Sequence, residues 1–134
     1  MNRKGFTLIE IIMVILIMAI LMLILIPNVF VLVNKNKEKS CFNLIDNIES
    51  AAKIYVINNK YDLGFNCGVI KKITLQTLVN SGDLKTDSAG RIVNPLDGEI
   101  LYDSITANKV IIDVTYNCDN KIFTYVVNGF DCIK

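Results

Sequence analysis

Apolar residues are concentrated near the start of the chain. Between positions 6 and 33, 24 of the 28 residues are apolar, and positions 11–26 form an unbroken apolar run. A helix rises about 1.5 Å per residue and the hydrocarbon core of a membrane is about 30 Å thick, so this segment is long enough to cross it. The pattern predicts a hydrophobic transmembrane helix over 6–33.

After a charged join at 34–39, apolar residues return at steps of three and four, which predicts a helix with one apolar stripe. The stripe consists of Cys41, Leu44, Ile45, Ile48, Ala52, Tyr55 and Val56. No helix breaker separates this stretch from the first. We therefore expect one helix from Phe6 to about Asn59, whose external half occupies 34–60.

The remaining residues, 61–134, predict a globular head that contains a short helix capped by Thr74. Inward-facing and outward-facing positions alternate along 110–116, and 122–127 is rich in β-branched and aromatic residues, so the two segments predict a hairpin. Residues 99–103 predict a third strand. The expected fold is therefore α+β. A long N-terminal spine helix, membrane-spanning in its first half, packs on a small antiparallel β-sheet.

The composition removes several classes of function. The chain has no histidine, which excludes Ser-His and Cys-His nucleophile pairs and nearly all His-containing zinc sites. It also lacks a G-x-x-x-x-G-K-[ST] loop for a nucleotide, and its net charge of +1 predicts no nucleic-acid partner. We therefore expect neither an enzyme nor a cofactor. We also expect no metal, because the acidic turn of Asp97, Glu99 and Asp103 matches no EF-hand spacing.

One carboxylate, Glu10, lies within the apolar segment. A charged side chain costs about 2.5–3.5 kcal/mol at the centre of a bilayer on insertion scales, and such residues usually mark a function. Thr7, three residues earlier on the same helix face, can donate one hydrogen bond but cannot neutralise the charge. Glu10 therefore needs a cationic partner that the neighbouring sequence does not provide.

A secretory signal peptide is an alternative explanation of the segment, because Arg3 and Lys4 precede the apolar run. However, the run exceeds the roughly 7–15 residues of a signal peptide, and no pair of small residues follows it. We expect the segment to stay on the protein. A further alternative is a plain single-span anchor that carries a binding or sensor domain.

Residues 4–10 have the sequence Lys-Gly-Phe-Thr-Leu-Ile-Glu and precede the apolar run and Pro27. This arrangement resembles the class III signal of type IV prepilins and pseudopilins. The resemblance implies a leader peptide at 1–5 that a membrane peptidase removes after Gly5. It also implies methylation of the new amino terminus at Phe6.

The same resemblance implies how Glu10 is neutralised. Cleavage leaves a cation on Phe6, and the Glu10 carboxylate of one copy can pair with that amine on a neighbouring copy, which penalises wrong axial registers. Thr7 and Pro27 are the other residues assigned to assembly. Pro27 either kinks the helix or marks a region that loosens in the fibre.

The implied function is that of a structural subunit, a pilin. It would wait in the cytoplasmic membrane with its N-terminus inside and then enter an extracellular type IV pilus. A pseudopilin of a type II secretion or DNA-uptake apparatus, in a short envelope-spanning fibre, is the alternative. The implied partners are further copies, other pilins, a prepilin peptidase, the assembly platform with its ATPase, and membrane lipid before assembly.

The four cysteines, Cys41, Cys67, Cys118 and Cys132, form no C-x-x-C pair, which favours disulfides in an oxidising compartment over zinc. Three pairings are possible, and the sequence leaves them open. We favour a bond from Cys118 to Cys132, which would staple a hairpin turn to the tail across 13 intervening residues and resembles the C-terminal loop of many pilins. Cys41 would then pair with Cys67.

Overall fold

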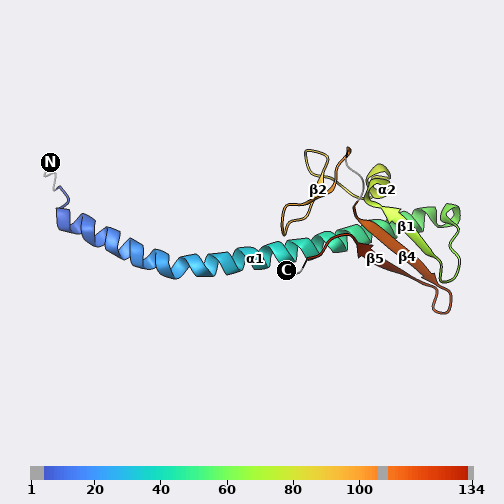
Figure 1. The fold of residues 1–134 in the computed structure, drawn as a ribbon, viewed down its shortest axis with the longest axis horizontal. Coiled ribbons are helices and arrows are strands. Elements are labelled where there is room, and N and C mark those ends of the chain that lie inside the picture. The colour runs from blue at the N-terminus through green and yellow to red at the C-terminus, as the bar shows by residue number, and fades with distance from the viewer. Residues whose placement is uncertain (1–4, 106–108, 133–134) are drawn as a thin grey trace. The chain divides into compact units, whose positions relative to one another are not determined.

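The structure is a computed structural model that describes residues 5–105 and 109–132, without the side chains at positions 27 and 28. The chain divides into two units, Met1–Asn36 and Lys37–Lys134. The described part of the first unit is almost entirely helical. The second unit holds the later part of the same helix, a short helix and five strands (Figure 1).

Helix α1 runs from Leu8 to Leu63, and the backbone of Asn59 departs from helical geometry, with φ −115° and ψ 15°. The side-chain amide of Asn59 donates a hydrogen bond to the backbone carbonyl of Tyr55 at 2.9 Å. Asn favours such local bonds, which compete with the helical backbone pattern. The predicted long helix is confirmed, although a last turn follows the end predicted at Asn59.

Strands β1 (Ile70–Thr74), β4 (Ile111–Asn117) and β5 (Ile122–Asn128) form an antiparallel sheet in the order β1-β4-β5 (Figure 1). The hairpin of β4 and β5 is confirmed. Strand β1 was not predicted, because Lys71 and Lys72 interrupt its apolar pattern. It forms because it pairs along its whole length with β4.

The second part of α1 packs on one face of this sheet, within the second unit. Ile48 and Val56 of the helix are fully buried, as are the alternate residues Ile112 and Val114 of β4. Each such side chain contributes about 1.5–3 kcal/mol when it is removed from water. The predicted α+β architecture, a long N-terminal helix on a small antiparallel sheet, is confirmed.

Helix α2 (Leu75–Asn80) follows β1 directly. The hydroxyl of Thr74 accepts a hydrogen bond from the backbone N–H of Thr77 at 3.3 Å, which is the geometry of an N-cap. The cap predicted at Thr74 is confirmed. Leu75 and Leu78 lie on the inner side of the helix and are fully buried in the core.

A second, smaller sheet consists of β2 (Ile92–Val93) and β3 (Ile100–Tyr102), which run antiparallel. The strand predicted at 99–103 is therefore present as β3. It pairs with β2 and is no part of the main sheet. The two-residue β2 is too short to show an alternating pattern in the sequence.

Two disulfides join Cys41 to Cys132 and Cys67 to Cys118, so the favoured pairing of Cys118 with Cys132 and Cys41 with Cys67 is wrong. A disulfide needs Cα atoms within about 7 Å of each other. Strand β5 lies between Cys118 at the hairpin turn and Cys132 in the tail, and seven extended residues span about 23 Å. Cys41 and Cys67 are similarly far apart, because more than 20 residues of α1, about 33 Å of helix, lie between them.

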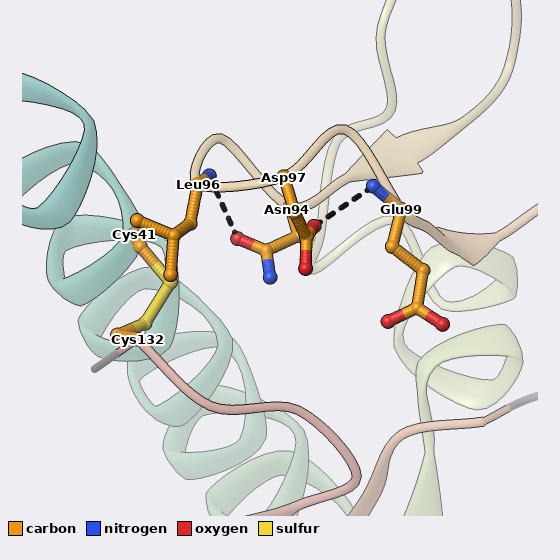
Figure 2. Close-up of a disulfide and its surroundings, with 6 residues drawn as sticks. All are labelled: Cys41, Asn94, Leu96, Asp97, Glu99 and Cys132. Carbon is orange, nitrogen blue, oxygen red and sulfur yellow. Dashed lines mark hydrogen bonds between the residues drawn. A yellow bond between two sulfur atoms is a disulfide. The ribbon is translucent and has the colours of Figure 1, made fainter. Parts of the chain in front are cut away.

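The two disulfides lie in different surroundings. Cys41 and Cys132 are buried, and Figure 2 shows their bond between α1 and the C-terminal tail. Cys67 is exposed, and its bond ties the segment after α1 to the hairpin turn at Cys118. The backbone N–H of Gly68 supports this second tie by donating to the carbonyl of Tyr116 at 3.0 Å.

Candidate assembly site

The first turn of α1 is closed by reciprocal hydrogen bonds between Thr7 and Glu10. The backbone N–H and the hydroxyl of Thr7 each donate to Oε2 of Glu10 at 2.9 Å. In return, the backbone N–H of Glu10 lies 3.4 Å from the Thr7 hydroxyl oxygen and 3.1 Å from the Thr7 carbonyl oxygen. This arrangement is a capping box, with Thr7 as the N-cap and Glu10 at the third helical position.

The capping box gives Glu10 a local role that the sequence reasoning missed. We expected a single hydrogen bond from Thr7, whereas two donors on Thr7 bind the carboxylate. The Thr-x-x-Glu spacing was the signal that could have revealed it. The carboxylate also lies at the positive end of the helix dipole, which favours a negative charge there.

These contacts orient Glu10 but do not neutralise it. Both bonds from Thr7 use Oε2, and among the described residues no donor binds Oε1 of Glu10. No salt bridge between described residues includes Glu10 either. One oxygen and the charge of the carboxylate therefore have no counterpart among the described residues.

The predicted cleavage site lies just before the helix. Gly5, Phe6 and Thr7 are outside any helix or strand, and Phe6 is 81% exposed. A side chain placed on Gly5 would meet no atom within 4 Å, so the bond after Gly5 is open to approach. Lys4 and the rest of the predicted leader before Gly5 lie outside the described residues.

The described apolar side chains after Glu10 in the first unit are exposed. Within the described residues one helix, α1, is long and apolar enough to cross a membrane, judged by length and composition. Its most apolar 18 residues have a mean hydropathy of 3.3, and none of them is buried. The backbone of Pro27 belongs to α1. The kink or loosening predicted at Pro27 stays a prediction.

The acidic side chains of the head were the candidates for a metal site. No cluster of three or more potential metal-ligating side chains occurs in the described residues. In the acidic turn shown in Figure 2, the Asp97 carboxylate accepts the backbone N–H of Glu99 at 2.9 Å, and the buried Asn94 accepts that of Leu96 at 3.0 Å. These side chains shape the turn.

Comparison with known proteins identifies the N-terminal region. Residues 1–26 match the family described as the prokaryotic N-terminal methylation motif. The chain carries this methylation motif. The resemblance to type IV pilins and pseudopilins is thereby confirmed, and the motif together with the apolar helix indicates a membrane-anchored protein.

One curated relative is the ComG operon protein 3 homolog of Bacillus licheniformis, which is 41% identical over 59 residues. The aligned region covers 44% of this chain, and the chain spans 61% of the length of the relative. No solved structure matches the chain. The two matches thus concern the N-terminal methylation motif and less than half of the chain.

Proposed function

We propose that this protein is a structural subunit of a type IV pilus, cut after Gly5, methylated on Phe6 and polymerised through the N-terminal part of α1. The observation that carries the proposal is Glu10, a carboxylate at the start of an apolar helix that has hydrogen-bond donors but no cationic partner among the described residues. Cleavage after Gly5 creates the missing cation on Phe6. The matched methylation motif covers both residues.

Electrostatics favour pairing between copies. Removing one partner of a buried ion pair costs about 3–5 kcal/mol, because the other charge stays buried without compensation. When apolar helices pack together and exclude water, only the register that places an amine beside Glu10 avoids this cost. The ion pair then sets the axial position of each added copy, and other pilins join through the same contact.

The remaining partners follow from this route. A prepilin peptidase cuts and methylates the chain, and an assembly platform driven by a cytoplasmic ATPase extracts it from the membrane. The N-terminus starts inside and the head outside, where both disulfides persist in an oxidising environment. The protein itself catalyses no reaction in this scheme.

Variants at Glu10 test the proposal. Glu10→Gln keeps an acceptor for the Thr7 donors, as in a capping box with Gln, but removes the charge. We expect Glu10→Gln and Glu10→Val to reach the membrane and to be cut after Gly5, while filament yield falls at least about tenfold, as the loss of a buried ion pair requires.

Glu38→Gln is the matched control, because Glu38 is an exposed acid on α1 beyond the apolar segment. Filaments sheared from cells and quantified by immunoblot, beside the membrane-bound pool, give the measurement. A normal filament yield from Glu10→Gln would refute the ionic role of Glu10.

The second candidate is a pseudopilin of a secretion or DNA-uptake apparatus. The observation in its favour is the similarity to the ComG operon protein 3 homolog. Electron microscopy with an antibody against the head separates the candidates. Long surface fibres that bind the antibody indicate a pilus, whereas label confined to the cell envelope indicates a pseudopilin.

A further inference from the structure

A hollow of about 380 Å³ opens on the surface of the head beside the bond between Cys67 and Cys118. The two cysteines line it together with Gly68, Thr115, Tyr116, Asn117 and Asp119. Cys67 is exposed and Cys118 is half-buried, so a small molecule in the hollow can reach the disulfide from solvent. The bond between Cys41 and Cys132 offers no such approach, because both residues are buried.

The residue after Cys67 leaves this bond uncovered. Gly68 has a φ of +71°, in the left-handed region that favours glycine. A side chain placed on Gly68 would meet no atom within 4 Å, so the space there is open. The backbone conformation at Gly68 thus favours the one residue type that adds no side chain beside the sulfur of Cys67.

Backbone contacts hold the two cysteine segments together independently of the disulfide. The backbone N–H of Gly68 donates to the carbonyl of Tyr116 at 3.0 Å, and Cys67 forms an isolated parallel bridge with Tyr116. In the hairpin turn, the side-chain carbonyl of Asn117 accepts the backbone N–H of Asp119 at 2.9 Å. Opening the disulfide therefore does not require β1 and β4 to separate.

We propose that the bond between Cys67 and Cys118 is a thiol–disulfide exchange site of the folded head, and that a small thiol enters the hollow and becomes joined to Cys67. The thiolate of the small molecule attacks the sulfur of Cys67, and a new sulfur–sulfur bond forms there. The bond to Cys118 breaks, and Cys118 leaves with the electron pair as a thiolate. The proton lost by the attacking thiol returns to Cys118, so the exchange needs no further oxidant or reductant.

Access determines which of the two sulfurs is attacked. The rate of exchange depends on how freely the attacking thiolate reaches the disulfide sulfur, and Cys67 is the more exposed partner. The small thiol is therefore retained on Cys67 and the free thiol appears on Cys118. This assignment concerns the head alone and does not depend on whether the chain polymerises.

The charge of Asp119 affects the same step. Its carboxylate belongs to the wall of the hollow and repels an approaching thiolate. A cation at position 119 would attract the thiolate instead. Dissolved salt screens both effects, because the Debye length falls from about 10 Å at 0.1 M to about 3 Å at 1 M. The rate of exchange should therefore depend on the charge at position 119 and on ionic strength.

Reduced glutathione tests the site on the full oxidised chain in detergent at mildly alkaline pH. N-ethylmaleimide then caps every free thiol, and mass spectrometry of the peptides locates both groups. We expect glutathione on Cys67 with the maleimide on Cys118 at least about fivefold more often than the reverse arrangement. Neither group should be found on Cys41 or Cys132 while the head is folded.

A series of low urea concentrations shows whether the exchange occurs in the folded head. Attack on Cys67 through the hollow needs no unfolding, so its rate should stay constant across the series. Attack on the bond between Cys41 and Cys132 needs an opening that exposes buried surface, so its rate should rise steeply with urea. The buried bond is thus the control within every sample.

A charge reversal tests the role of the hollow. Asp119→Lys keeps the backbone N–H that Asn117 binds and should speed the attachment of glutathione by about threefold to tenfold at low ionic strength, and by less in 1 M salt. Asp46→Lys is the matched control, because Asp46 is an exposed acid on α1 that does not line the hollow. It should leave the rate unchanged.

The inference is overturned if glutathione is found equally often on Cys118, or if it attaches only at urea concentrations that also open the bond between Cys41 and Cys132. Equal acceleration by Asp119→Lys and Asp46→Lys would exclude the hollow as the site. A thioredoxin-type protein, tested beside glutathione, would exclude a small thiol if it alone opened the bond. All these results leave filament formation untouched, so the proposed function is tested separately.

Discussion

The two parts of α1 share one secondary structure but have opposite surroundings. In the first unit the apolar side chains are exposed on every side of the helix, whereas in the second unit one face, which includes Ile48 and Val56, is fully buried. A helix that is apolar all round needs a surrounding apolar medium, while a helix with one apolar stripe needs one covering layer. The first part therefore requires an apolar medium around it, whereas the second part has its covering layer within its own unit.

The largest effect expected within the head comes from removing the buried disulfide. Cys41→Ala with Cys132→Ala opens a loop with a sequence separation of 91 residues, which in the chain-entropy model costs about 4–5 kcal/mol of unfolding free energy. Deuterium exchange of the β4 amides, measured on the full chain in detergent, reports this free energy. Membrane insertion of the first part of α1 should not change.

The exposed disulfide provides the comparison for that experiment. Cys67→Ala with Cys118→Ala opens a loop with a sequence separation of 51 residues, and Cys67 is exposed. We therefore expect a smaller loss of unfolding free energy, about 4 kcal/mol or less. The bond from Cys67 to Cys118 should also react first with an added reductant. Faster reduction of the bond from Cys41 to Cys132 would contradict the assigned burial.

A matched pair of core-type substitutions sharpens the comparison between the two parts of the helix. Ile48→Ala removes a fully buried side chain and should lower the unfolding free energy of the head by about 2–5 kcal/mol. Ile15→Ala removes the same atoms from a side chain that is 63% exposed and should leave amide exchange in β4 unchanged. Equal destabilisation by both variants would show that the first part of α1 also packs on the head.

The smallest effect expected is electrostatic and confined to a surface turn of the head. The Asp87 carboxylate accepts the backbone N–H of Arg91 at 2.8 Å and that of Ala89 at 2.9 Å. The hydrogen bond from Arg91 is the main cause of a pKa for Asp87 below its ordinary value, with further contributions from Ala89 and from the charge of Arg91. The charged carboxylate is therefore favoured in the folded state.

Because the folded-state pKa of Asp87 is lowered, its stabilisation is complete above the ordinary aspartate value of about 3.9 and disappears as the pH falls through the folded-state value. Asp87→Asn should slightly destabilise the head at neutral pH, and the difference from wild type should vanish in acid. Unfolding curves of both proteins across that pH range test this. A difference that grows on acidification would have the wrong sign.

Local patterns in the sequence were sufficient for much of the fold. The apolar run and the stripe predicted α1, and the hydroxyl of Thr74 predicted the cap of α2. Alternation predicted β4, and a β-branched and aromatic run predicted β5. Each of these signals lies within the element that it specifies. The Thr7 and Glu10 capping box was equally local, and it was missed because Glu10 was considered only as a charge.

Features that depend on distant parts of the chain were not predictable in the same way. Strand β1 contains Lys71 and Lys72 and becomes a strand through its pairing with β4. The disulfide pairing follows from where α1 and β5 place their ends, so nearness in sequence suggested the wrong partner for Cys132. The contacts proposed for the apolar segment are with other copies, so no pattern within one chain specifies them.

The identity of the first residue of the mature protein tests the central claim most directly. Protein purified from the cells that produce it can be digested, and its N-terminal peptide measured by mass spectrometry. The account predicts a peptide that begins at Phe6 and carries a methyl group on its amine, the cation that Glu10 requires. A mature protein that still carries the residues before Phe6 would contradict it.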